Sequence, residues 1–258
     1  MALVELETID SHIGRLTLNR SEAANSLSLA LLNELSEQLD DIERSDLRVL
    51  IITGSGPKAF CAGADLKERS GMTEAEVVET VRKIGETITK VEQLSIPTIA
   101  MINGAAYGGG LELALACDVR TMSQHAKCGL TETSLAIIPG AGGTQRLPRL
   151  IGLGKAKELI FTARSVTAEE AVNIRLVESI HPPEDLDRET LHMAHLMSNN
   201  GPFALKLAKT AVNSGFETDK HTGLVFEHQC YKQTIPTSDR EEGLKAFKEK
   251  RKPEYKGR

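Results

Sequence analysis

The chain has 258 residues, a formal net charge of −5, 40% hydrophobic residues and 26% charged residues. This length allows one large domain, or one domain with a smaller appendage. The acidic balance argues against a nucleic-acid binder, and no apolar run approaches the roughly 18 residues of a membrane-spanning helix. The acidic, strand-like start MALVELETID is unlike a targeting peptide, which predicts a cytoplasmic protein.

Strand and helix signals alternate through the first part of the chain. Residues 3–19 predict a hairpin and residues 28–44 an amphipathic helix, before a buried strand at 47–54. A capping box formed by Thr73 and Glu76 begins a second helix, which precedes another buried strand at 96–104. This order predicts an α/β core with largely parallel strands.

After His181 the pattern becomes almost wholly helical. Segments that begin near residues 185, 202, 220 and 238 contain no strand signal, and Ser238 with Glu241 predicts a capping box for the last of them. We therefore expect a core over residues 1–195 and a helical region over residues 196–258. The tail from 245 to 258 carries seven Lys or Arg against two Glu, either as a solvated helix end or as a contact for an anionic ligand.

The cysteines do not form a recognisable framework. The four residues, at positions 61, 117, 128 and 230, show neither a CxxC pair nor the spacing of zinc ligands. This scatter predicts buried, reduced thiols. No metal and no redox cofactor is implied by the sequence.

The stretch GAAYGGGLELALACD begins an apolar helix with three glycines, at positions 108 to 110. A helix N-terminus exposes unpaired N–H groups, and glycine lets a ligand approach them closely, so the triplet is suited to hold an oxyanion. A second small-residue turn, Ala62 to Ala64 in KAFCAGADLKE, follows a predicted strand. Each signal alone is more typical of a turn than of a site, but together they offer two amide donors of the kind that enolate chemistry uses.

Two glutamates complete the candidate site. Glu112 lies inside the apolar run LELALACD, where a lone carboxylate needs a partner or a function. Glu132, in GLTETSLAIIPG, has neutral neighbours, which is also compatible with an exposed position. A pair of carboxylates in a partly apolar pocket can hold one charge and one proton, which is the equipment for adding water across a double bond.

Rival motifs are absent from the sequence. The glycines of the triplet and of IPGAGGTQRL do not fit GxGxxG, because Gln145 occupies the third glycine position in the latter segment. Neither a Walker A motif nor GxSxG is present, so phosphoryl transfer and serine hydrolysis have no support.

The sequence resembles the enoyl-CoA hydratase/isomerase (crotonase) superfamily over nearly the whole chain. Four segments match family motifs in the family order: AFCAGADLKE, INGAAYGGGLELALACD, AIIPGAGGTQRLPRLIG and EGLKAFKEKRKPEYK. The resemblance implies an α/β crotonase-like core in which ββα turns form a spiral. It also implies a C-terminal helical trimerisation region, with a homotrimer or a hexamer built as a dimer of trimers.

The resemblance also implies roles for individual residues. The N–H groups of Ala62 and Gly109 would form the oxyanion hole for an acyl-CoA thioester, and Glu112 and Glu132 would position and activate water. The resemblance places seven further residues at the substrate: Ala64, Asp65, Leu66, Lys67, Gly140, Phe247 and Lys250. Among these, Gly140 would line the water pocket, Lys67 and Lys250 would approach the CoA phosphates, and Phe247 would form a wall of the acyl pocket. A neighbouring subunit would supply Phe247 and Lys250.

Both acids are present, as in the hydratases of the superfamily, whereas many isomerases lack one of them. We therefore expect hydration of a 2-enoyl-CoA to a 3-hydroxyacyl-CoA. Two stretches look especially like the methylglutaconyl-CoA hydratase branch of leucine degradation, and a catalytically silent CoA-binding scaffold is the second alternative. That branch includes an RNA-binding member with a lysine-rich helix, but the corresponding helix here, at 73–93, has five Glu against three Lys or Arg, which argues against nucleic acid as a partner.

Overall fold

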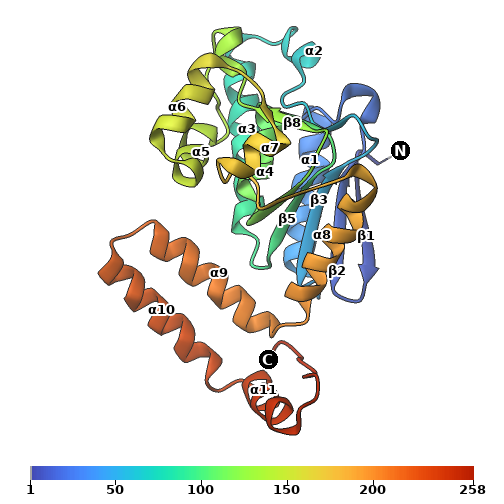
Figure 1. The fold of residues 1–258 in the computed structure, drawn as a ribbon. Helices are drawn as coiled ribbons and strands as arrows, with labels where there is room; N and C mark the ends of the chain where they lie inside the picture. The colour runs from blue at the N-terminus through green and yellow to red at the C-terminus, as the bar shows by residue number, and fades with distance from the viewer. Residues whose placement is uncertain (1) are drawn as a thin grey trace.

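Two β-sheets form the centre of the protein in the computed structural model, which describes residues 2–258 (Figure 1). The larger sheet has the strand order β1-β2-β3-β5-β7-β10 and the smaller one β4-β6-β8-β9. The bounds of the strands are β1 Val4–Asp10, β2 Ile13–Leu18, β3 Val49–Gly54, β4 Ala59–Cys61, β5 Thr98–Ile102, β6 Ala105–Tyr107, β7 Val119–Ser123, β8 Lys127–Gly129, β9 Val166–Thr167 and β10 Ser179–His181.

Helices follow the strands in a repeating order. Their bounds are η1 Ser21–Ala23, α1 Leu29–Glu43, α2 Leu66–Arg69, α3 Glu74–Gln93, α4 Gly109–Ala116, η2 Glu132–Leu135, α5 Gly143–Ile151, α6 Leu153–Thr162, α7 Ala168–Asn173, α8 Pro183–Ser198, α9 Pro202–Phe216, α10 Lys220–Thr234 and α11 Ser238–Glu249. In the part of the chain described here, none of them is both long and apolar enough to cross a membrane.

The chain winds as a spiral of ββα turns. Strands β3, β5 and β7 add to the large sheet in parallel, while β4, β6 and β8 add in parallel to the small sheet. After each pair of strands, helical segments lead to the next turn, as α2 and α3 do after β4. The predicted α/β class with largely parallel strands is confirmed, and so is the hairpin of β1 and β2.

Local sequence signals account for the helix starts in the core. The Ser28 side chain accepts a hydrogen bond from Leu31 N at the start of α1, which buries its leucine face. The predicted capping box of Thr73 and Glu76 is present at the start of α3. These caps satisfy N–H groups that the first helical turn leaves unpaired.

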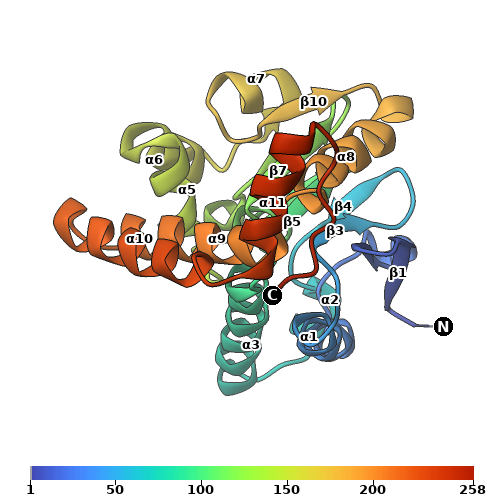
Figure 2. The same ribbon diagram turned by 90° about the horizontal axis from the view of Figure 1, so that it is seen from below.

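The C-terminal helices form a separate layer. Helix α8 packs on the large sheet through Leu186 and Ala194, and the predicted boundary at residue 195 falls inside this helix. Beyond it, α9 and α10 lie side by side and project from the core, with α11 at their end (Figures 1 and 2). An ion pair of 2.8 Å between Lys209 Nζ and Asp118 Oδ2 ties α9 to the core.

The capping box predicted for the last helix is wrong by one residue. Thr237, not Ser238, caps α11, and its side chain accepts from Arg240 N. The Ser238 hydroxyl instead donates to the main-chain oxygen of Arg258 at 2.7 Å. The returning C-terminal tail therefore takes the hydroxyl that the local pattern assigns to the helix.

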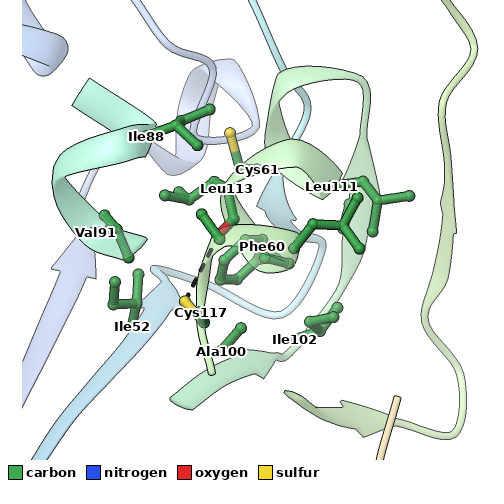
Figure 3. Close-up of a cluster of buried hydrophobic side chains, with 14 of the residues drawn as sticks. Ile52, Phe60, Cys61, Ile88, Val91, Ala100, Ile102, Leu111, Leu113 and Cys117 are labelled. Carbon is green, nitrogen blue, oxygen red and sulfur yellow. Dashed lines mark hydrogen bonds between the residues drawn. The ribbon is translucent and has the colours of Figure 1, made fainter. Parts of the chain in front are cut away.

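The hydrophobic core lies between the sheets and the helices. Figure 3 shows Cys61 and Cys117 among apolar side chains that include Phe60 and Leu113, with the Cys117 thiol donating to Leu113 O. All four cysteines are buried and free, as predicted. Burial raises the pKa of the Cys61 thiol to about 12, which is the behaviour of a packing residue and not of a nucleophile.

Candidate active site

The three segments singled out in the sequence follow three neighbouring strands of the small sheet. The turn 62–64 follows β4, the glycine triplet follows β6, and Glu132 comes shortly after β8. Strands β4, β6 and β8 pair in parallel, so their C-terminal ends lie side by side along the same end of the sheet. Ligands of parallel sheets bind outside this end.

A cavity of about 930 Å³ opens at this end of the sheet. It is lined by Ala64 and Gly109 from the two small-residue segments and by both Glu112 and Glu132. The remaining wall is mainly apolar and comes from α2, α3 and the segment 135–138, with the side chains Leu66, Val77, Val78, Val81, Ile84, Leu135, Ile137 and Ile138. A mostly apolar cavity with a few convergent polar groups is typical of a small-molecule site.

The glycine triplet serves different purposes at each position. Gly108 caps α4 with φ of 53° and ψ of −124°, a conformation that suits glycine alone. A Cβ on Gly110 would lie 2.0 Å from Cys61 O, so this glycine lets α4 pack directly on the end of β4. Between them, Gly109 carries its N–H at the open N-terminus of the helix.

Two main-chain N–H groups are free to bind a ligand in the cavity. Throughout residues 2–258, neither the Ala64 N–H nor the Gly109 N–H finds an acceptor within the chain. The two segments approach so closely that a Cβ on Gly63 would lie 3.1 Å from Gly109 N. A Cβ on Gly109 would likewise lie 3.7 Å from Ala64 N. The two free donors therefore lie close together, as a pair of donors to one oxygen atom must.

The prediction that Ala62 supplies the first donor is wrong. Its N–H donates to Ala24 O at 3.0 Å and is therefore consumed within the fold. Ala64, two residues further along the same turn, carries the free N–H instead. Both alanines lie in one run of small residues, and only the pairing of the loop with residues 24–27 distinguishes them.

Glu112 projects from the first turn of α4 and is 2% exposed. Its Oε1 atom accepts hydrogen bonds of 2.8 Å from both Ala141 N and Gly143 N. Burial raises the pKa of Glu112, while these two amides and the Arg146 charge oppose the rise. The carboxylate is therefore held in one orientation by donors that favour its ionised form.

Glu132 has a different environment. Its Oε2 atom is buried and has no partner among residues 2–258. Burial and the negative charge of Glu112 together raise the pKa of Glu132 to about 7. The pKa of Glu132 therefore lies close to neutral pH, whereas the two amide donors on Glu112 favour the ionised form of that carboxylate.

The comparisons with known proteins agree with this geometry. A match to the family described as Enoyl-CoA hydratase/isomerase spans residues 8–258. The chain belongs to this family. Within the enoyl-CoA hydratase/isomerase family, YngF of Bacillus subtilis (strain 168), named as a member of it, is 55% identical over 249 residues, 96% of each chain.

Two further relatives in the enoyl-CoA hydratase/isomerase family extend the comparison. Human mitochondrial methylglutaconyl-CoA hydratase is 49% identical over 257 residues, 98% of this chain and 76% of the relative. The crystal structure of an enoyl-CoA hydratase from Bacillus anthracis superposes with a TM-score of 0.99 at 53% identity, covering 100% of both chains. The predicted crotonase-like fold is therefore confirmed.

Of the remaining residues predicted at the substrate, some line the cavity of this enoyl-CoA hydratase/isomerase chain and others lie outside it. Leu66 and Gly140 line the cavity. Lys67 is exposed on α2 outside it. Helix α11, which contains Phe247 and is capped by Lys250, lies at the opposite end of the molecule from α2 (Figure 1). Neither residue lines the cavity of its own chain.

Asp65, expected at the substrate, serves the fold instead. Its Oδ1 accepts from the N–H groups of Lys67 and Glu68 and so caps α2, and its Oδ2 pairs with Arg20 at 2.6 Å. Although burial acts to raise it, the pKa of Asp65 is lowered by the hydrogen bond from Arg20 and by the two backbone donors. Both carboxylate oxygens are engaged, and Asp65 is not part of the cavity wall.

Sequence reasoning missed two features of the site. The first is the pair of amides, at Ala141 and Gly143, that holds Glu112; the glycines of IPGAGG were a signal for it, since a Cβ on Gly143 would lie 3.0 Å from Glu112 Oε1. The second is Arg69, which lines the cavity although no local pattern indicates it. As for metals, residues 2–258 hold no group of three His, Cys, Asp or Glu side chains that could bind an ion.

The raised pKa of Glu132 predicts a pH-dependent penalty on stability. Below the ordinary pKa of 4.5 both states are protonated, whereas from there to about 7 only the unfolded state loses its proton, so stability falls as pH rises. Glu132→Gln removes the penalty. We expect it to stabilise the fold at pH 8.5 by about 1 to 3 kcal/mol, with partial exposure limiting the gain.

Thermal unfolding measured between pH 5 and pH 8.5 checks this expectation. The gain in Tm should shrink as the pH falls toward 5, because ionisation then favours the unfolded state of the wild type less and less as the pH approaches the ordinary pKa of 4.5. The exposed Glu37 on α1 provides a control, and Glu37→Gln should change Tm little at either pH. A gain for Glu132→Gln that does not vary with pH would contradict the assignment.

Proposed function

We propose that the protein adds water across the C2=C3 double bond of a 2-enoyl-CoA to give a 3-hydroxyacyl-CoA. The proposal rests on one observation: two free main-chain N–H groups and two carboxyl groups line the same cavity. The N–H groups of Ala64 and Gly109 would bind the thioester oxygen and stabilise the negative charge that it gains as the enolate forms. This places Ala64, rather than Ala62, in the oxyanion hole.

The environments of the two carboxyl groups suggest their roles. Glu112, fixed by two amide donors, would accept a proton from water as the oxygen attacks C3. Glu132, whose pKa is about 7, would hold the proton that is delivered to C2. The two groups thus provide a base and an acid at the same pH.

The direct test is the loss of the enoyl thioester absorbance when the protein meets crotonyl-CoA. We expect turnover that saturates with substrate and a 3-hydroxyacyl-CoA product. An inactive protein that still binds CoA thioesters tightly would refute the proposal and favour the silent scaffold.

Hydration of 3-methylglutaconyl-CoA is a second candidate function. It is favoured by the human, rat and mouse enzymes named methylglutaconyl-CoA hydratase, each of which is 49% identical over 257 residues. Acyl choice depends on pocket shape, and related pockets often differ by modest energies. A parallel assay with 3-methylglutaconyl-CoA ranks the two substrates by kcat/KM.

We also propose that the site is completed by assembly into a homotrimer, or a hexamer of two trimers. Phe247 is 86% exposed, and it lies with Lys250 far from the cavity of its own chain. A neighbouring subunit could therefore receive both side chains, the first at the acyl pocket and the second at the CoA phosphates. Size-exclusion chromatography with light scattering measures the mass of the assembly, which should equal three or six copies of the chain. A cytoplasmic location stays a prediction.

A further inference from the structure

The carboxylate of Glu112 is held by a segment that consists mostly of glycine. Three of the four residues from 140 to 143 are glycines, and the fourth is Ala141. Gly140 and Ala141 line the active-site cavity, and both also line a second cavity of about 780 Å³. A glycine backbone has no side chains to pack and adopts many conformations unless hydrogen bonds restrain it. The two amides that donate to Glu112 therefore need an anchor.

Arg146, near the start of α5, provides this anchor. Its Nη1 donates to Ala141 O at 2.9 Å, and its main-chain N–H donates to Gly142 O at 2.8 Å. The guanidinium lies directly against Gly142, since a Cβ on that residue would lie 2.0 Å from Arg146 Nη1. Ala141 is thus held at both of its main-chain polar groups, with its N–H on Glu112 and its C=O on Arg146.

Helix α3 fixes the guanidinium from the other side. Arg146 donates through Nε to Glu92 Oε1 at 3.1 Å and through Nη2 to Glu92 Oε2 at 2.7 Å, and Nη2 also reaches Thr89 Oγ1 at 3.4 Å. A planar guanidinium bound by both oxygens of one carboxylate is fixed in direction as well as in place. Helix α4, which carries Glu112, packs against both α3 and α5 (Figure 1). The contacts therefore link all three helices through Arg146.

The charges around Glu112 agree with this geometry. Burial raises the pKa of Glu112, while the two amide donors and the positive charge of Arg146 lower it. Glu132, from η2, is the other carboxyl group that interacts with Glu112, and Glu92 pairs with the Arg146 charge from α3. Arg146 thus favours the form of Glu112 that can accept a proton.

We propose that Arg146 is a positioning residue for the hydration: held by Glu92, it fixes the segment 140–143 so that Glu112 meets the attacking water in one orientation. The inference rests on the proposed hydration of enoyl-CoA thioesters, in which Glu112 is the base. Among residues 2–258, Arg146 is not one of those that line the active-site cavity. It therefore acts through Glu112 and does not touch the substrate.

Arg146→Met removes both the anchor and the charge. We expect it to lower kcat for crotonyl-CoA roughly 10- to 100-fold, as a small misplacement of a catalytic group does, with KM close to the wild-type value. The acid limb of the kcat profile should move to higher pH, because Glu112 loses groups that favour its ionised form. Arg146→Lys keeps the charge without the two-fold pairing to Glu92, and it should restore part of the rate.

Arg149→Met is the matched control. Arg149 lies on the same helix as Arg146, is more exposed and pairs with Glu217. Its replacement should change neither kcat nor the pH profile. Wild-type kcat in Arg146→Met, or the same loss in Arg149→Met, would overturn the inference.

A second background separates positioning from a merely structural role. In Glu112→Gln the base is already absent, so the addition of Arg146→Met should lower kcat little further. An equal loss in both backgrounds would assign Arg146 to the general integrity of the fold and overturn the inference. Glu92→Gln weakens the anchor without a change in α5. It should show the same dependence on background, and it serves as the test if Arg146→Met does not fold.

The pKa of Glu112 provides a test that does not depend on turnover. In protein labelled with ¹³C at the glutamate carboxyl groups, the NMR signal that is lost in Glu112→Gln identifies this residue. Its titration should move to higher pH in Arg146→Met and stay in place in Arg149→Met, and an unchanged titration in Arg146→Met would overturn the inference. A shifted titration in a protein that does not hydrate crotonyl-CoA would sustain the role of Arg146 and refute the proposed hydration.

Discussion

Glu112→Gln and Glu132→Gln are each expected to lower kcat for hydration roughly 10²- to 10⁴-fold, the usual contribution of one general acid or base. A glutamine side chain at position 112 keeps an oxygen that can accept from Ala141 N and Gly143 N, but it cannot take a proton from water. A glutamine at position 132 retains the shape of a protonated carboxyl without an acidic proton for C2. Both changes therefore remove chemistry and preserve the cavity.

Steady-state rates with crotonyl-CoA and titration with butyryl-CoA, which has no double bond, check this prediction. The Kd for butyryl-CoA should stay close to the wild-type value, because its saturated acyl chain carries no charged or polar group with which either carboxyl could interact. The double variant should be little slower than the worse single one, since the two groups act together in one addition step. Near-wild-type turnover in either single variant would remove that residue from the mechanism.

Gly110→Ala is expected to destabilise the protein by more than about 3 kcal/mol. The new Cβ would lie 2.0 Å from Cys61 O and 2.7 Å from Cys61 C, and both are main-chain atoms at the end of β4. Relief of the overlap requires that α4 move away from β4, which would also separate the N–H groups of Ala64 and Gly109. Thermal unfolding followed by circular dichroism measures the effect.

Gly154 in α6 offers a matched control. No atom lies within 4 Å of a Cβ placed there, and alanine favours helices by about 1 kcal/mol over glycine. Gly154→Ala should therefore leave Tm unchanged or raise it. If Gly110→Ala has the same Tm as the wild type, α4 and β4 do not pack as closely as the overlap with Cys61 implies, and the prediction is wrong.

Local patterns of the sequence were enough to predict much of the fold. Alternating apolar runs and helical stripes predicted the hairpin, α1, β3, α3 and β5, because burial of one face and the capping of helix ends are decided by neighbouring residues. The spiral of ββα turns came only from the resemblance to a family. Spacing along the chain does not specify which strands of which turn share a sheet.

The residues of the site also fall into those that local sequence predicts and those that depend on distant segments. The helix start at Gly109 and the buried Glu112 could be read from a few adjacent residues, because a glycine-rich helix N-terminus and a carboxylate in an apolar run are local anomalies. Glu132 was a weaker signal. Its position in the cavity, and hence its raised pKa, depends on the end of β8 meeting the end of β6.

Tertiary structure alone decided which polar groups are free. Ala62 and Ala64 look alike in the sequence, but only the first meets Ala24 O; likewise Asp65 is consumed by Arg20, 45 residues away, while Arg69 is left unpaired in the cavity. The sequence by itself determined which residue types stand at the strand ends and helix starts. Whether a given N–H or charge remains available depends on partners that only packing of distant segments brings within hydrogen-bond distance.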